Sequence, residues 1–196
     1  KIEGALRGGV DVVQLRSKHL SDRVLFDLGK QIRILTEKLK KLFIVNDRAD
    51  LALAVDADGV HLGQEDLPIE FARKLMRDKI IGRSTHSLDQ ALQAEREGAD
   101  YIAFGPIFET PTKPTYRAVG LEPIREVVNR IRIPVVCIGG IDSSNVKEVI
   151  GAGANRIAVV RAIFSAPDAY EAASEFNVIL RRSRRISGWD PSLRSG

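Results

Sequence analysis

The chain has 196 residues, enough for one domain with a full-sized hydrophobic core. Its 30 basic and 26 acidic residues nearly balance, and a net charge of +4 argues against a nucleic-acid-binding protein. No apolar run is long enough to span a membrane and no signal peptide is visible. The single cysteine, Cys137, excludes an internal disulfide and a thiolate metal cluster, which fits a reducing compartment, so we expect a cytoplasmic protein.

Short β-branched runs alternate with longer amphipathic segments along the chain. We predict strands at 10–16, 42–46, 58–62, 79–84, 100–105, 133–139 and 155–160. Helical patterns lie between them, at 21–40, 68–77, 87–97, 121–131 and 143–152, and residues 1–9 resemble the end of another helix. In the segment 87–97, Ser87 is the expected N-cap, Gln90 takes the capping-box position and Gly98 marks the end.

The strict alternation of strands and helices predicts a parallel sheet with helices on the outside. We predict an α/β fold, a (β/α)8 TIM barrel that lacks its first strand in this chain, the missing strand lying before Lys1. An open doubly wound sheet is the alternative, disfavoured because no G-x-G-x-x-G motif follows a strand. Residues 1–183 would form this N-terminally incomplete domain, and 184–196 a disordered or added tail.

Polar side chains follow almost every predicted strand. In a barrel, the strand ends and the loops after them form one face, where active sites are built. Any one of these residues alone is more often solvated than functional, but their number at one face favours a site. The candidates are Gln14, Arg16, Lys18, Asn46, Asp47, Gln64, Glu65, Asp66, Ser84, Thr85, His86, Thr110, Thr112, Lys113, Gly139, Gly140, Asp142 and Arg161.

The motif QLRSK predicts an anion site. Strand side chains alternate between two faces, so Gln14, Arg16 and Lys18 point to the same side. Two neighbouring cations repel each other, and an anion between them is favoured over a solvated rim. Lys113 can add a third cation from its loop.

Two carboxylates follow separate strands and indicate a divalent cation. Mg²⁺ takes one or two carboxylates and completes its shell with water and phosphate oxygens, which fits Asp47 and Asp66. Magnesium diphosphate is favoured over structural roles, in which Asp47 belongs to a turn and Asp66 caps the helix beginning near Pro68.

A second phosphate site is indicated after the last two strands, at IGGIDSSN and AVVRAIF. Barrels often hold a monophosphate there with backbone N–H groups and the start of a short helix, although a structural turn explains the two glycines almost as well. His61 and His86 are candidate bases, but His61 lies within a strand and fits a satisfied core residue too. No credible Ser–His or Cys–His nucleophile pair is visible.

Seven ordered motifs resemble those of the thiamine phosphate synthase family: VQLRSK, VND, GVHLGQEDL, GRSTHS, FGPIFETPTK, CIGGI and AVVRAI. The resemblance extends from about Gly8 to about Leu180. It implies a (β/α)8 barrel transferase that joins a pyrimidine methyl diphosphate to a thiazole phosphate, with Mg²⁺ as cofactor. Thiamine phosphate and diphosphate would be the products, and small-molecule substrates the partners. A homo-oligomer is compatible with the sequence.

The resemblance also implies roles for individual residues. The pyrimidine diphosphate would be bound by Gln14, Leu15, Arg16, Ser17, Lys18, Asn46, Ser84 and Lys113. The thiazole phosphate would be bound by Thr110, Pro111, Thr112, Gly140, Val160 and Arg161, and Mg²⁺ by Asp47 and Asp66. Arg16, Lys18 and Lys113 would be catalytic, because they meet the charge that develops on the departing diphosphate. Many family members have Ser in place of Arg161.

The long loop 104–120 has no apolar period, and its role follows from the resemblance. It would reach over the barrel mouth, and its prolines would reduce the freedom lost when it closes. We expect it to be ordered with ligand and mobile without it. The reaction would be a dissociative substitution, in which diphosphate leaves a pyrimidine-stabilised cation that the thiazole nitrogen captures.

Two other functions stay open. A thiazole tautomerase-like isomerase shares the barrel and resembles this chain around GRSTHSLDQALQAEREGADY. Its pattern carries His at the position of Pro106 and lacks the Thr-Pro-Thr-Lys run, which favours the synthase. The other alternative is a non-catalytic phosphate-ligand-binding homologue, incompetent because its first strand is missing.

Overall fold

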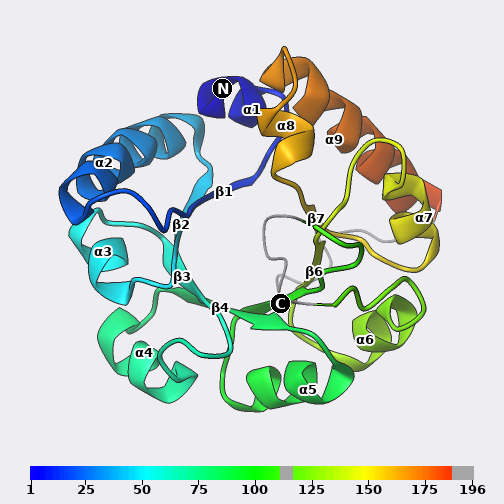
Figure 1. The fold of residues 1–196 in the computed structure, drawn as a ribbon, viewed down its shortest axis with the longest axis horizontal. Coiled ribbons are helices and arrows are strands. Elements are labelled where there is room, and N and C mark those ends of the chain that lie inside the picture. Colours follow the sequence, from blue (N-terminus) through cyan, green and yellow to red (C-terminus); the bar gives the residue numbers. More distant parts are fainter. Residues whose placement is uncertain (111–116, 187–196) are drawn as a thin grey trace.

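Seven parallel strands curve into a ring with the helices outside it (Figure 1). The computed structural model describes the backbone of residues 1–110 and 117–186, and the side chains up to residue 180. The strands are β1 (Val12–Leu15), β2 (Leu42–Asn46), β3 (Gly59–Leu62), β4 (Ile80–Thr85), β5 (Tyr101–Phe104), β6 (Val135–Ile138) and β7 (Ile157–Ala158). Each pairs with the next in chain order, which confirms the seven predicted strands and the TIM-barrel-like α/β fold.

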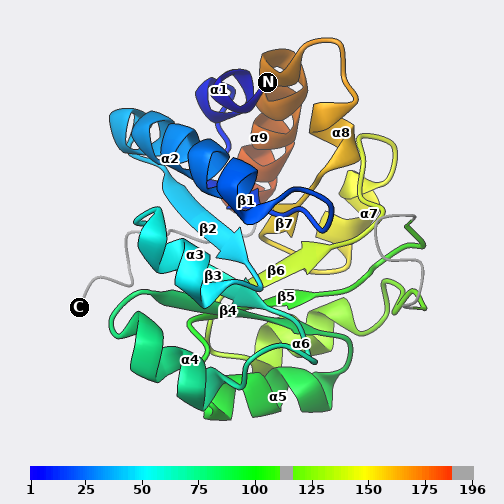
Figure 2. The ribbon, with the colours of Figure 1, turned by 60° about the vertical axis from the view of Figure 1, so that its left-hand side comes forward.

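The helices form the outer layer of this ring (Figure 2). They are α1 (Ile2–Arg7), α2 (Asp22–Leu39), α3 (Ala49–Ala54), α4 (Ile69–Met76), α5 (Leu88–Arg96), α6 (Ile124–Arg130), α7 (Val146–Gly151), α8 (Arg161–Phe164) and α9 (Ala169–Ile186). α1 packs against α9 beside the gap between β1 and β7, two strands that are not paired with each other in the described part of the chain. None of the helices searched is both long and apolar enough to cross a membrane.

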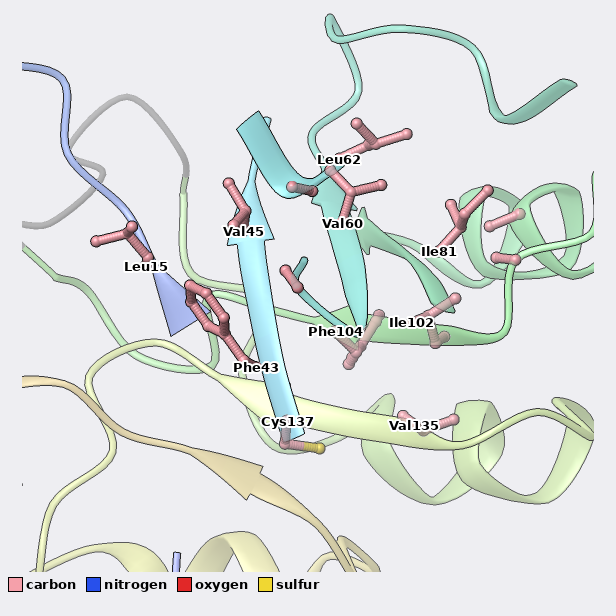
Figure 3. Close-up of a cluster of buried hydrophobic side chains, with 14 of the residues drawn as sticks. Leu15, Phe43, Val45, Val60, Leu62, Ile81, Ile102, Phe104, Val135 and Cys137 are labelled. Carbon is pink, nitrogen blue, oxygen red and sulfur yellow. The ribbon is translucent and has the colours of Figure 1, made fainter. Parts of the chain in front are cut away.

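The hydrophobic core lies between the outer face of the sheet and the helices. Alternate strand side chains supply it, as expected from the period of two. Figure 3 shows this outward-facing cluster, which contains Leu15, Phe43, Val45, Val60, Leu62, Ile81, Ile102, Phe104, Val135 and Cys137. Burial raises the pKa of the Cys137 thiol to about 12, so this cysteine is an inert core residue.

The inner face of the same strands is more polar. Asn46 is in register with His61, His61 with Gly82, and Gly82 with Tyr101. Register partners share a face of a parallel sheet, and the apolar residues next to them in sequence, such as Val45, Val60 and Ile102, belong to the outer core. These four residues therefore face the inside of the barrel. The apolar core lies on the opposite, outer face of the sheet, so the inner face can carry hydrogen-bonding groups.

Local signals set the start of α5 nearly as predicted. Ser87 is the N-cap, and its hydroxyl accepts a hydrogen bond from the N–H of Gln90. The side chain of Gln90 accepts from the N–H of His86 at 2.8 Å, one residue earlier than in the capping box that the sequence predicts. The reciprocal contact thus ties the end of β4 to the first turn of α5.

Candidate active site

Arg16 and Lys18 lie in the loop after β1, on what we call the carboxyl-end rim, formed by the strand ends and the loops that follow them. Arg16 is half-buried, and its Nε atom is buried with no hydrogen-bond partner among the described residues. Lys18 is exposed and makes no ion pair in the described part of the chain. An orphaned, buried guanidinium donor is costly unless a ligand accepts from it, which supports the predicted anion site.

The two residues flanking Arg16 differ from it in orientation and partners. Leu15 is buried in the outer core, so only its backbone can face a ligand at the rim. The hydroxyl of Ser17 accepts hydrogen bonds from the N–H groups of His19 and Leu20 at 3.3 and 3.2 Å. Ser17 therefore folds the loop back after Arg16.

Asp47 and Asp66, the predicted metal ligands, follow the neighbouring strands β2 and β3 and are half-buried. Asp47 has a left-handed backbone (φ 63°), and its N–H donates to the carbonyl of His61 at 2.8 Å. Asp66 Oδ2 accepts from the N–H of Gly63 at 2.6 Å. The alternative role of Asp66 as the cap of α4 is wrong, because the N-cap is Pro68 and no side chain caps it.

The two carboxylates fit a hard cation such as Mg²⁺, provided that water or phosphate oxygens supply its other ligands. Within the described residues, no group of three or more His, Cys, Asp or Glu side chains could hold a metal ion. Two carboxylates alone suit Mg²⁺, which fills its remaining positions with water and phosphate oxygens. The arrangement therefore fits a metal bound jointly by the protein and a phosphorylated ligand.

Inside the barrel, four polar side chains from four strands form one connected group, which we call the interior network: Gln14, His61, Ser84 and Tyr101. His61 Nδ1 lies 2.9 Å from the Tyr101 hydroxyl, and His61 Nε2 lies 2.9 Å from Ser84 Oγ. Burial raises the pKa of Tyr101, and a side-chain hydrogen bond with Gln14 acts in the opposite direction.

The interior network depends on a close approach at β4. A Cβ atom at position 82 would lie 2.1 Å from Cζ of Tyr101, so only glycine lets this ring reach across the strand to His61. The side-chain amide of Gln64 donates to the carbonyl of Ser84, which fixes the end of β4. Ser84 is thus held through both its hydroxyl and its backbone.

The two candidate bases, His61 and His86, have different hydrogen-bond partners in the structure. His61 is 5% exposed and has partners at both ring nitrogens, as the core-residue interpretation predicts. The Nδ1 atom of His86 is hydrogen-bonded to the carbonyl of Gly105. His86 thereby connects β4 to the start of the long loop after β5.

The residues predicted to bind a second phosphate follow β6 and β7: Gly140 lies in the loop after β6, and Val160 and Arg161 lie at the start of α8. Gly140 has a positive φ of 66°, and a Cβ atom there would lie 2.7 Å from Cβ of Phe108. Hydrogen bonds from Ser144 hold the pKa of Asp142 below its ordinary value, and the charge of Arg161 adds to this effect. Arg161 therefore lies within electrostatic range of the loop that contains Gly140. Val160 is the N-cap of α8.

The long loop after β5 is anchored at both of its described ends. The N–H of Ile107 donates to the carbonyl of Ile138, and the N–H of Phe108 donates to that of Gly139. On the return, the N–H of Val119 donates to the carbonyl of Pro106. Thr110 is the last described residue before the gap; the predicted ligands Pro111, Thr112 and Lys113 lie outside the described residues.

The sequence prediction missed Tyr101 as a member of the site. The alternation in DYIAFG places Tyr101 opposite the core residues Ile102 and Phe104, so its inward direction could have been inferred. Its contact with His61 could not, because it depends on register across three strands.

Comparisons with known proteins agree on one family. Residues 1–163 match the family model described as thiamine monophosphate synthase. The chain is 48% identical over 179 residues to the thiamine-phosphate synthase of Pyrococcus abyssi, covering 91% of this chain and 86% of that protein. It is 48% identical to that of Chloroflexus aurantiacus, with 91% and 83% covered. A solved thiamine phosphate pyrophosphorylase from Pyrococcus furiosus superposes with a TM-score of 0.87 at 44% identity, covering 93% and 88%.

Proposed function

The chain belongs to the thiamine-phosphate synthase family and is a transferase of thiamine biosynthesis, and we propose that it joins a pyrimidine methyl diphosphate to a thiazole phosphate on the carboxyl-end rim. The products are thiamine phosphate and diphosphate. The observation that carries this placement is the orphaned Nε of Arg16 beside the unpaired Lys18, both within the described residues. Such a pair suits a ligand with high negative charge, as a diphosphate has.

The protein's task in this reaction is to stabilise charge on the leaving group. When the bond between the pyrimidine methylene and the diphosphate breaks, the bonding electrons leave with diphosphate. Arg16 and Lys18 meet that charge from the β1 loop, and Lys113 meets it from the loop after β5. The thiazole nitrogen then supplies its lone pair to the methylene carbon, so no protein nucleophile is needed.

The second substrate is assigned to the loops after β6 and β7. Gly140 allows the backbone to approach a phosphate closely, and Arg161, the first residue of α8, supplies a cation nearby. Thr110, Pro111 and Thr112 would approach the same phosphate from the loop after β5. The two phosphorylated groups thus occupy different parts of one rim, with the reacting atoms between them.

Asp47 and Asp66 would hold Mg²⁺ together with the diphosphate. When bound, the ion neutralises charge on the departing group. Asn46 and Ser84, at the ends of β2 and β4, would contact the pyrimidine substrate from the neighbouring positions of the rim. Asp66→Asn removes one of the two proposed carboxylate ligands, so we expect the Mg²⁺ concentration for half-maximal rate to rise by about tenfold or more.

The deciding experiment measures diphosphate release with both substrates present, with and without Mg²⁺. The proposal expects release only when the two substrates and Mg²⁺ are all present, in equal amount to the thiamine phosphate formed. Turnover of a thiazole compound without diphosphate release would instead support the isomerase. Tight binding of both phosphorylated ligands without turnover would support a non-catalytic homologue.

A further inference from the structure

We propose that His61 is a positioning residue: together with Tyr101, it holds the hydroxyl of Ser84 as a hydrogen-bond donor toward the barrel mouth. The inference rests on the proposed function, because the ligand that would accept from Ser84 is the diphosphate-bearing substrate. The observation behind it is the interior network, in which the ring of His61 lies between the Tyr101 and Ser84 hydroxyl groups, with one ring nitrogen 2.9 Å from each.

Burial of His61 and Ser84 makes the direction of the hydrogen bond between them consequential. His61 is 5% exposed and Ser84 9%. A neutral imidazole has one N–H donor and one acceptor nitrogen, so it can donate to only one of its two neighbours. Tyr101 and Ser84 are each able to donate or accept. The tautomer of His61 therefore determines where the proton of Ser84 points.

The chemistry of the two hydroxyl groups selects one tautomer. A phenol is a stronger acid than an alcohol and hence a better donor to an imidazole nitrogen. Tyr101 then donates to Nδ1, and Nε2–H of His61 donates to Ser84 Oγ. The amide of Gln14 donates to the phenol oxygen, which agrees with the direction of its effect on the pKa of Tyr101. Every link thus runs from Gln14 toward Ser84.

This direction leaves the proton of Ser84 for a ligand. Ser84 lies near the carboxyl end of β4, one residue before the last of the strand. With Nε2–H donating to its oxygen, the hydroxyl can donate to a phosphate oxygen at the rim. In the other tautomer Ser84 would donate inward to His61 and present only lone pairs, which repel an anion. The tautomer of a buried histidine thereby decides whether Ser84 attracts or repels the diphosphate.

The first test is nitrogen NMR of the full chain with isotope-labelled histidine. His61→Gln identifies the His61 signals, because it leaves only His19 and His86. We expect the Nε2–H tautomer in the wild-type protein and a mixture of tautomers in Tyr101→Phe. An Nδ1–H tautomer in the wild type overturns the proposal. This measurement needs no turnover, so it stands even if the proposed function fails.

The second test is a double-mutant cycle on the single-turnover rate of diphosphate release. Tyr101→Phe is expected to slow release about tenfold when Ser84 is present and less than twofold in the Ser84→Ala background. Tyr170→Phe, a matched change on the exposed face of α9, is expected to have no effect. The same loss from Tyr101→Phe in both backgrounds overturns the proposal. If the wild type releases no diphosphate, the proposed function fails instead.

A pair of histidine variants separates the two ring nitrogens. Glutamine places an amide near the position of Nε2 and can still donate to Ser84, whereas asparagine reaches only as far as Nδ1. We expect His61→Gln to retain about tenfold more activity than His61→Asn at similar stability. Equal activity of the two variants, or higher activity of His61→Asn, contradicts a role exerted through Ser84.

Discussion

Two aspartates at the amino-end rim, formed by the turns that lead into the strands, are paired with neighbouring elements. Asp58, before β3, accepts from Arg33 of α2 at 2.9 Å and from the N–H of Phe43 at 2.7 Å. Asp100, before β5, accepts in the same way from Arg73 and from the N–H of Ile81, at 2.6 and 2.7 Å. At the carboxyl-end rim, Arg16 and Lys18 have no such partners among the described residues.

The contrast separates residues that stabilise the fold from residues kept available for a ligand. The carboxyl-end rim does not exclude ion pairs: Arg48, which lies on it, is paired with Asp22 and Asp50 at 2.9 and 2.6 Å. Leaving Arg16 unpaired costs stability, because its Nε is shielded from water. Arg16 is therefore best explained by an anion that is present only during function.

The largest effect is expected from Lys113→Ala, which removes the loop cation proposed to meet the leaving group. We expect the chemical step to slow by roughly 100- to 1,000-fold, because a donor placed where charge develops contributes that much. Single-turnover kinetics measure this step directly. Lys147→Ala, an exposed lysine of α7, is the matched control and should leave the rate unchanged. An unchanged rate in Lys113→Ala would remove this residue from the mechanism.

Arg16→Gln and Arg33→Gln test the contrast between the two rims directly. Arg16→Gln should lower kcat/KM about 100-fold and raise the free energy of unfolding by about 1 kcal/mol, because it removes the buried Nε that has no partner among the described residues. Arg33→Gln should do the reverse, losing about 1 kcal/mol of stability through its ion pair with Asp58 and keeping its activity. Diphosphate-release assays and urea unfolding measure both. If the two variants behaved alike, the division between the rims would be wrong.

The strands were predictable because their signal is local. Each β-branched run between helical patterns became a strand, and the polar ends of those runs fall on one rim as parallel topology requires. The six-residue helix α3 was not predicted, since Ala49–Ala54 is too short to show a helical period. Such short elements are set by packing against neighbours rather than by their own pattern.

The site was predictable as a set of positions but not as a set of contacts. The motif QLRSK indicated an anion site, yet the buried, orphaned Nε of Arg16 depends on how the whole rim folds. The family resemblance included Leu15 among the ligands, whereas its side chain belongs to the outer core. The interior network was missed because it joins four strands through their register, which no single segment encodes.

Asp58→Ala should produce a moderate loss of stability with activity within about twofold of wild type. Phe43 is fully buried, and the change leaves its N–H without a hydrogen-bond acceptor. We expect this to lower the free energy of unfolding by about 2 kcal/mol. Asp11→Ala is the matched control: its carboxylate is paired with Lys41 but is 80% exposed, so we expect a loss under about 0.5 kcal/mol. Equal losses would mean that the backbone contact of Asp58 contributes nothing.

The smallest effect concerns pH and Asp56, at the amino-end rim. A hydrogen bond from Lys79, followed by the charge of Lys79, lowers the pKa of Asp56. A carboxyl with a lower pKa in the folded state adds stability above its unfolded pKa of about 4, and this is lost as pH falls through the folded pKa. Because the side chain is 73% exposed, the contribution should stay under about 0.5 kcal/mol.

Asp56→Asn tests this linkage without disturbing the backbone, because Asn tolerates the left-handed conformation that Asp56 adopts (φ 55°). The variant should be slightly less stable than wild type near pH 7 and equal to it near pH 2, where the carboxyl is protonated. Urea unfolding at the two pH values measures both differences. If Asp56→Asn were less stable than wild type by the same amount at both pH values, the loss would come from the amide side chain itself. The ion pair of Asp56 with Lys79 would then contribute no measurable stability.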